Sequence, residues 1–74
     1  MINNRDNQYL AKFGDNLRKL RQAKGLSQES LANDAEIGKN QVGLIERGEI
    51  NVTISTIKKL AKYLGVPPKD LLDF

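Results

Sequence analysis

Glycine residues divide this 74-residue chain into short segments whose apolar residues recur at the spacing of an α-helix. Apolar side chains three or four positions apart lie on one face of a helix. Gly25, Gly48 and Gly65 each follow such a segment, and glycine readily adopts the left-handed conformation that ends a helix. Short helices are marginal alone, so the pattern predicts several helices that pack around one shared core.

Five helices follow from this pattern, and no segment alternates in the manner of a strand. Residues 1–7 are polar and rich in asparagine, so we expect a loose N-terminal tail. Residues 8–74 are expected to form one all-helical domain, because a chain of this length holds a single core. The predicted helices are residues 8–24, a segment capped by Ser27, the segment from Lys39 to Arg47, a segment capped by Thr53 that ends at Leu64, and a short final helix that begins near Pro68.

The chain contains neither cysteine nor histidine. Disulfides and thiol chemistry are therefore excluded, and the commonest metal ligand and general base near neutral pH are missing. We expect no catalytic residues, no metal site and no cofactor, and the sequence indicates no small-molecule ligand. No apolar run approaches the length of a membrane span and no signal-peptide core follows Met1, so we expect a cytoplasmic protein without a membrane partner.

The formal net charge of +3 mildly favours a polyanionic partner, but the charge is unevenly distributed. Residues 8–25 hold five basic side chains and one acid, which gives +4. Residues 26–50 hold two basic side chains and five acids, which gives −3, and residues 51–74 hold four basic side chains and two acids, which gives +2. A nucleic-acid-binding function must therefore explain an acidic middle segment between two basic flanks.

The second and third predicted helices are joined by a short turn, and a glycine bounds the third, as a helix-turn-helix requires. Ala32 supplies the small side chain that a close crossing of two helices needs. Ile37, Val42 and Ile45 are placed to anchor the third helix from behind. The opposite face would then be free to enter a DNA major groove, and it carries Lys39, Asn40, Gln41, Gly43, Leu44 and Arg47.

Three segments carry a more specific pattern: residues 17–21 (LRKLR), 25–32 (GLSQESLA) and 45–48 (IERG). Together they resemble the Cro/phage-repressor type of helix-turn-helix protein, also called the xenobiotic-response-element (XRE) family. Residues 53–61 and 66–72 are similar to the fourth and fifth helices of that family. The resemblance implies a five-helix, lambda-repressor-like domain that binds operator DNA as a dimer, regulates transcription and has no enzymatic activity.

The resemblance places Lys39, Asn40 and Leu44 at positions where family members read DNA bases. Their chemistry agrees, because lysine can donate to guanine, asparagine can pair with adenine, and leucine can pack on a thymine methyl group. The alternative for each is a solvated helix face. Lys39 could equally contact a phosphate, and Leu44 could instead contact a protein. The residues expected to contact DNA phosphates are Gln28, which would also brace the third helix, Gln41, Arg47, Asn51 and Thr53.

Arg21 and Glu46 match positions that form an ion pair between the first and third helices in the family, so we expect a structural role for both. Such a pair would also neutralise one acid of the middle segment. Glu36 stands where the family usually has glycine. It must either adopt a left-handed conformation, at a cost on the order of 1 kcal/mol, or alter the turn. Ala35 replaces a larger aliphatic residue, so less extensive packing is expected beneath the turn.

Leu71, Leu72 and Phe74 crowd the end of the sequence and form the expected dimer interface, since C-terminal apolar patches in this family often pair two copies. The alternative is that all three cover the core of a monomer. A dimer would add stability to a chain with so small a core. It would also present two recognition helices to successive major grooves of a two-fold symmetric operator.

The sequence therefore predicts a sequence-specific, double-stranded DNA-binding transcriptional regulator, a dimeric repressor or controller that reads the major groove with its third helix. Phage repressors, restriction–modification controllers and antitoxin-like regulators all fit a chain of this length. The alternative is a protein-interaction module on the same fold, antitoxin-like or an adaptor, with little affinity for DNA. The modest net charge and the acidic middle segment slightly favour this alternative, whereas the basic first and fourth helices and the polar face of the third favour DNA binding.

Overall fold

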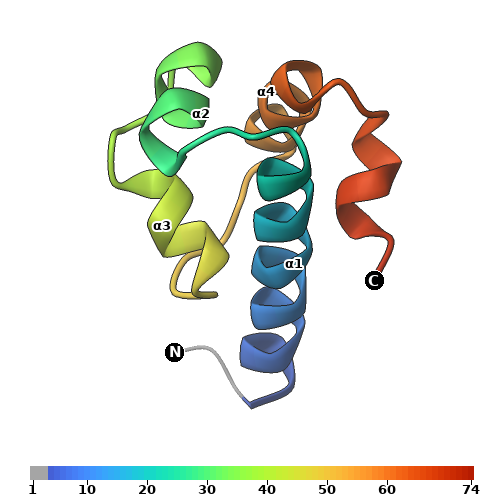
Figure 1. Cartoon of the computed structure of the whole chain (residues 1–74). Helices are drawn as coiled ribbons and strands as arrows, with labels where there is room; N and C mark the ends of the chain where they lie inside the picture. The colour runs from blue at the N-terminus through green and yellow to red at the C-terminus, as the bar shows by residue number, and fades with distance from the viewer. Residues whose placement is uncertain (1–3) are drawn as a thin grey trace.

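The computed structural model describes residues 4–74, with side chains from Asp6 onward. These residues form four α-helices and one 3₁₀ helix, and none of them lies in a strand, which confirms the predicted all-α class. The longest helix, α1, stands between the α2–α3 pair and the C-terminal segment, while α4 packs on α2 and on that segment (Figure 1). The elements are α1 (Asn4–Ala23), α2 (Gln28–Ala35), α3 (Gln41–Glu46), α4 (Ile54–Leu64) and the 3₁₀ helix η1 (Pro68–Leu72).

The first helix is longer than the sequence predicted. It begins at Asn4, so residues 4–7, expected to belong to a loose tail, form its first turn. No glycine or proline interrupts these residues. The carboxylate of Asp6 in the first turn interacts favourably with the positive end of the helix dipole, which stabilises the start of the helix. Residues 1–3 of the expected tail lie outside the described residues.

Every element contributes to one hydrophobic core. None of the short helices buries its apolar face alone, so each depends on the others for most of its stability. The apolar spacing that predicted the helices therefore also identified the residues that pack. The largest fully buried side chains are Leu17 of α1, Leu31 of α2, Val42 and Ile45 of α3, Leu60 and Leu64 of α4, and Leu71 of η1.

The helix ends follow the predicted capping chemistry. The hydroxyl of Ser27 accepts a hydrogen bond from the backbone N–H of Ser30 at 2.9 Å, and that of Thr53 accepts one from Thr56 at 3.2 Å. Gly65 ends α4 in a left-handed conformation with a φ of 72°. These caps give partners to backbone groups that have none inside the helix.

The turn between α2 and α3 keeps a left-handed residue although it lacks the usual glycine. Glu36 has φ 57° and ψ 43°, and its backbone N–H donates to the carbonyl oxygens of Ala32 and Asn33. The side chain is exposed, and the bonds to the end of α2 offset a conformational cost of about 1 kcal/mol. Glu36 therefore adopts the left-handed conformation, as one of the two expected outcomes, and does not alter the turn. Ala35 beneath the turn is buried.

The backbones of α1 and α3 approach each other directly at Gly14. A Cβ atom on Gly14 would lie 2.3 Å from the carbonyl oxygen of Ile45 and 2.5 Å from that of Glu46. No side chain can occupy this position without pushing the two helices apart. Gly14 therefore sets how closely α3 packs on α1, and with it the direction in which the outer face of α3 points.

Replacing Gly14 by alanine is expected to destabilise the fold, although alanine favours a helix interior by about 1 kcal/mol. Forcing a methyl group against two carbonyl oxygens should lower the free energy of unfolding by about 1–3 kcal/mol, measured by urea denaturation. Gly38→Ala is the control, because a Cβ atom there meets only the side chain of Gln41, at 3.4 Å. A Gly14→Ala variant as stable as the parent chain would contradict the close approach.

Candidate nucleic-acid interface

The helix α3 turns its apolar side inward and its N-terminal end toward solvent. Val42 and Ile45 on the inner side are 0% and 2% exposed. Lys39, Asn40 and Gln41 at the start of the helix are all exposed. Three polar side chains that can donate hydrogen bonds therefore project from the end of the helix that contacts base edges in helix-turn-helix proteins.

The regular part of α3 is shorter than the predicted segment from Lys39 to Arg47. The backbone N–H of Gln41 donates to the carbonyl oxygen of Gly38 at 2.9 Å, which closes a turn ahead of the helix. Asn40 is the N-cap, and Lys39 precedes it within the turn. Both residues therefore lie in the turn that leads into α3 and not within the helix itself.

The middle of the expected outer face is less open than predicted. A Cβ atom on Gly43 would lie 3.1 Å from Nη1 of Arg47 and 3.3 Å from Oε1 of Gln28, so these two side chains cover the glycine. Gly43 is buried as a result, and the expectation that it lies free on this face is wrong. Leu44 is half-buried, which leaves only part of its side chain accessible.

A buried ion pair joins α1 to α3, as predicted. Nε of Arg21 donates to Oε2 of Glu46 at 2.6 Å and Nη2 donates to Oε1 at 3.1 Å, while the two side chains are 11% and 3% exposed. Nη1 of Arg21 donates to the backbone carbonyl of Leu26 at 2.8 Å. The side-chain amide of Gln28, at the start of α2, donates to Oε1 of Glu46 at 3.0 Å. One carboxylate therefore ties together three helices.

The acids of the middle segment are largely kept away from the outer face of α3. Glu46, the one acid on α3, is neutralised within the buried pair. Glu49 is paired with Arg47, with 2.5 Å between Oε2 and Nε. The acidic charge of residues 26–50 thus no longer argues against a DNA-binding α3, because the remaining acids, Glu29, Asp34 and Glu36, lie on α2 or at its C-terminal end.

The loop after α3 leads to the start of α4, where further phosphate contacts were expected. Asn51 is exposed in this loop. The hydroxyl of Thr53 is occupied in capping α4 and also lies 3.0 Å from the hydroxyl of Thr56. A phosphate contact near Thr53 would therefore use backbone N–H groups of the first turn of α4 rather than the hydroxyl.

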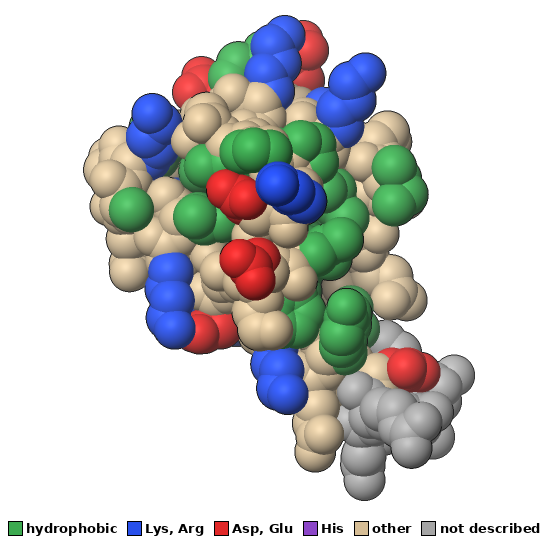
Figure 2. Space-filling model, turned by 90° about the vertical axis from the view of Figure 1, so that its right-hand side faces the viewer, with side chains coloured by type: hydrophobic (Ala, Val, Ile, Leu, Met, Phe, Trp, Pro, Cys, Tyr) green, Lys and Arg blue, Asp and Glu red, His purple; other side chains and the backbone are tan. Residues whose placement is uncertain are grey.

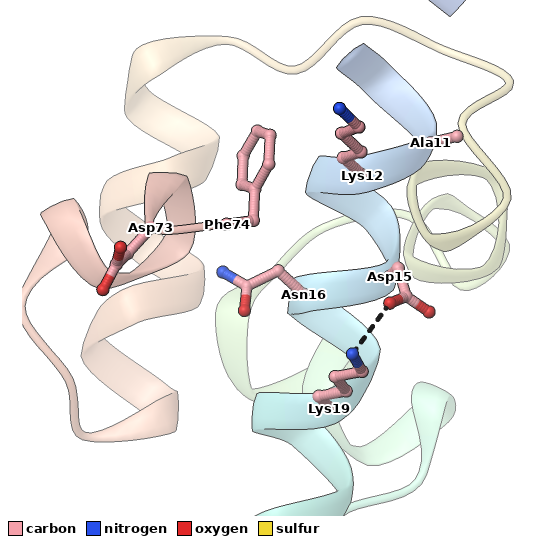
Figure 3. A pocket seen from close by; sticks show the side chains of 7 residues that line it. All are labelled: Ala11, Lys12, Asp15, Asn16, Lys19, Asp73 and Phe74. Atoms are coloured by element: carbon pink, nitrogen blue, oxygen red, sulfur yellow. Dashed lines mark ion pairs between the residues drawn. The ribbon is translucent and has the colours of Figure 1, made fainter. Parts of the chain in front are cut away.

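A hollow of about 580 Å³ lies between α1 and the end of the chain (Figure 3). It brings two lysines together with two aspartates, and one of these lysines, Lys19, lies 3.2 Å from Asp15. Across residues 6–74, no three acidic, cysteine or histidine side chains are grouped so that they could hold a metal ion.

None of the described helices has both the length and the apolar character needed to cross a membrane. The longest, α1, is 20 residues long but is predominantly polar.

The C-terminal residues only partly form the expected interface. Leu71 is 0% exposed and belongs to the core, so its assignment to a dimer interface is wrong. Leu72 and Phe74 are 47% and 46% exposed, and the ring of Phe74 packs edge-on against exposed Tyr9 of α1 at 5.1 Å between centroids. Figure 2 views the side of the molecule that carries the C-terminal segment, and apolar side chains gather across it. We call Tyr9, Leu72 and Phe74 the C-terminal apolar patch.

Sequence reasoning missed two contacts near these surfaces. The side-chain amide of Asn16 donates to the carbonyl oxygens of Asp70 and Leu71, at 2.8 and 3.1 Å, and so fixes η1 on α1. The pairing of Arg47 with Glu49 was also missed, because residues two positions apart beside a loop have no regular spacing that predicts contact. Only the opposite charges of the neighbouring side chains could have indicated it.

The comparisons with known proteins agree with this geometry. The sequence profile described as "Helix-turn-helix" matches residues 17–71. The chain is 46% identical over 63 residues to the control protein C.BamHI of Bacillus amyloliquefaciens, covering 84% of this chain and 78% of the relative. It is 38% identical over 60 residues to RstR, a cryptic phage CTXphi transcriptional repressor of Vibrio cholerae, covering 81% of this chain and 54% of the relative. The crystal structure of the restriction–modification controller protein C.AhdI from Aeromonas hydrophila matches with a TM-score of 0.82 and 50% identity, covering 84% of this chain and 94% of that one.

The buried pair predicts a large loss of stability on removing one partner. The Arg21→Ala variant would leave the carboxylate of Glu46 buried without a cation, which costs about 3–5 kcal/mol. That approaches the total net stability of about 3–5 kcal/mol typical of a chain this small, so the variant should be largely unfolded by thermal and urea denaturation.

Arg18→Ala is the matched control on the same helix. Arg18 pairs with Asp15 on the exposed surface, and its removal is expected to cost less than about 1 kcal/mol. Equal melting temperatures for the two variants would show that the buried pair does not hold α3 in place.

Proposed function

This chain belongs to the helix-turn-helix family of Cro/phage-repressor type, whose members are sequence-specific DNA-binding transcriptional regulators, and we propose that it acts as a homodimeric controller reading a two-fold symmetric operator. The observation that carries the proposal is the orientation of α3. Its polar N-terminal end faces solvent while its one acid is turned inward and neutralised. We assign it no enzymatic activity, and binding to the genome would place it in the cytoplasm.

The base contacts come from the start of α3. Asn40 can accept from and donate to adenine, and Lys39 can donate to O6 and N7 of guanine. Both side chains are exposed. Leu44, which is half-buried, has enough accessible surface to meet a thymine methyl group.

The phosphate contacts surround this reading surface. Gln28 uses one N–H of its amide for Glu46 and retains a second for a phosphate oxygen, so it can brace α3 and contact DNA together. Gln41, the first residue of α3, and Asn51, in the loop that follows the helix, are exposed polar donors. The N-terminus of α4 near Thr53 offers backbone N–H groups to an anion. Arg47 is an exposed cation at the opposite end of α3.

Similarity to C.BamHI and C.AhdI supports the role of a controller of restriction–modification genes, because the chain spans most of the length of both. Similarity to the repressor RstR covers about half of that protein and supports the family rather than the role. A controller or a repressor of this kind must present two copies of α3 to DNA, so it needs a surface for self-association.

The C-terminal apolar patch is the surface we propose for the dimer. Of the three residues predicted to form the interface, Leu72 and Phe74 are exposed and can contact a second copy. Tyr9 of α1 extends this surface through its ring contact with Phe74. Beside them lies a hollow of about 130 Å³ between α1 and α4, into which a side chain of a second copy could insert. Burying this patch would also offset the small core of one chain.

The reading role of α3 is tested by selecting bound oligonucleotides from a random pool. We expect a two-fold symmetric consensus with half-sites about one helical turn apart. Asn40→Ala should weaken binding to it by about 1–3 kcal/mol and relax the preference at one base pair of each half-site. The control Gln41→Ala should instead weaken binding to all sequences alike. If the two variants selected the same sequences, the division of Asn40 and Gln41 into a base contact and a phosphate contact would be wrong. Binding that is insensitive to salt, or undetectable at low salt, would instead favour a protein-interaction module.

The dimer surface is tested with Leu72→Asp, which places a charge in the C-terminal apolar patch. Burying that charge should raise the dimer dissociation constant by at least about tenfold, or about 1.4 kcal/mol, measured by analytical ultracentrifugation. Asn33→Asp adds the same charge on the exposed surface of α2 and should leave it unchanged. An unchanged dimer in Leu72→Asp would place the interface elsewhere.

A further inference from the structure

The guanidinium group of Arg47 is held by a residue of its own chain. Its Nε lies 2.5 Å from Oε2 of Glu49, and the two side chains are 58% and 51% exposed. Its Nη1 lies 3.1 Å from the position of a Cβ atom on Gly43, the preceding turn of α3. The side chain of Arg47 therefore folds back over α3 instead of extending from the end of the helix.

A carboxylate and a DNA phosphate offer arginine the same kind of partner, an anionic oxygen that accepts N–H bonds. Arg47 cannot give its full charge to both. An exposed pair contributes little to the stability of a fold, so this one is not needed to hold α3 in place. It is still strong enough to change a DNA-binding constant several-fold.

We propose that Glu49 restrains sequence-independent DNA binding by competing with backbone phosphates for Arg47. The inference rests on the proposed DNA-binding function and deepens it. Phosphate contacts hold any duplex, whereas base contacts distinguish one sequence from another. Withholding the charge of Arg47 leaves a larger share of the binding free energy to Lys39 and Asn40, and so favours the operator over other DNA. Glu49 is thus a positioning residue that acts through Arg47.

The experiment measures binding to a random-sequence duplex across a range of salt concentrations. Glu49→Gln keeps the size of the side chain and removes its charge. It should raise affinity at low salt about two- to five-fold. It should also steepen the slope of log K against log salt by about 0.9, the change for one additional phosphate contact.

The same substitution in an Arg47→Ala background separates release of Arg47 from simple loss of a negative charge near DNA. The gain from Glu49→Gln should disappear in that background. An equal gain in both backgrounds, or no gain in either, would overturn the proposal. Asp34→Asn removes one negative charge from the exposed surface of α2, and a gain as large as that of Glu49→Gln would also overturn it.

Failure of this inference and failure of the proposed function give different results. If the parent chain binds duplex DNA with a clear salt dependence and Glu49→Gln changes nothing, only the role of Glu49 is lost. If the parent chain binds no duplex at low salt, the DNA-binding function itself is wrong. Both Arg47 and Glu49 are more than half exposed, so the variants should retain the melting temperature of the parent chain.

Discussion

The buried ion pair between Arg21 and Glu46 is the interaction on which the placement of α3 depends. A carboxylate that is 3% exposed is strongly unfavourable unless a cation and hydrogen-bond donors surround it. Arg21 comes from α1 and Gln28 from α2, so the charge of Glu46 is satisfied only when all three helices are in place. Gly14 makes this arrangement possible, because its missing side chain lets α3 approach α1 closely enough for the pair to form.

The placement of Glu46 also determines the electrostatics of the outer surface. A six-residue helix with one acid could have faced DNA with a negative charge, and burial of that acid removes the repulsion. The side chains left at the start of α3 are neutral or basic donors. The next acid along the chain after α3 is Glu49, and its carboxylate is paired with Arg47. The stability of the fold and the chemistry of the interface therefore rest on the same few side chains.

The helices and their ends could be predicted from the sequence because apolar spacing and capping are local. Ser27, Thr53 and Gly65 act on groups within four residues of themselves. The ion pair spans 25 positions, so its prediction came from the family resemblance and not from spacing.

Features that depend on long-range packing could not be predicted from local patterns. Gly43 is buried because side chains from α2 and from the end of α3 meet above it. Leu71 and Leu72 look equivalent in the sequence, yet the tight turn of η1 and its attachment through Asn16 bury the first and leave the second half exposed. The pattern of apolar residues alone cannot distinguish these two positions.

The most direct test of the central claim is an NMR titration of the labelled chain with duplex DNA, followed through its backbone amide signals. If α3 is the reading helix, the largest shifts will fall on residues 39–47 and on the first turn of α4, while the amides of η1 change little. Shifts concentrated in η1 and the first turns of α1, with α3 unaffected, would contradict the assignment of α3 as the DNA-reading element.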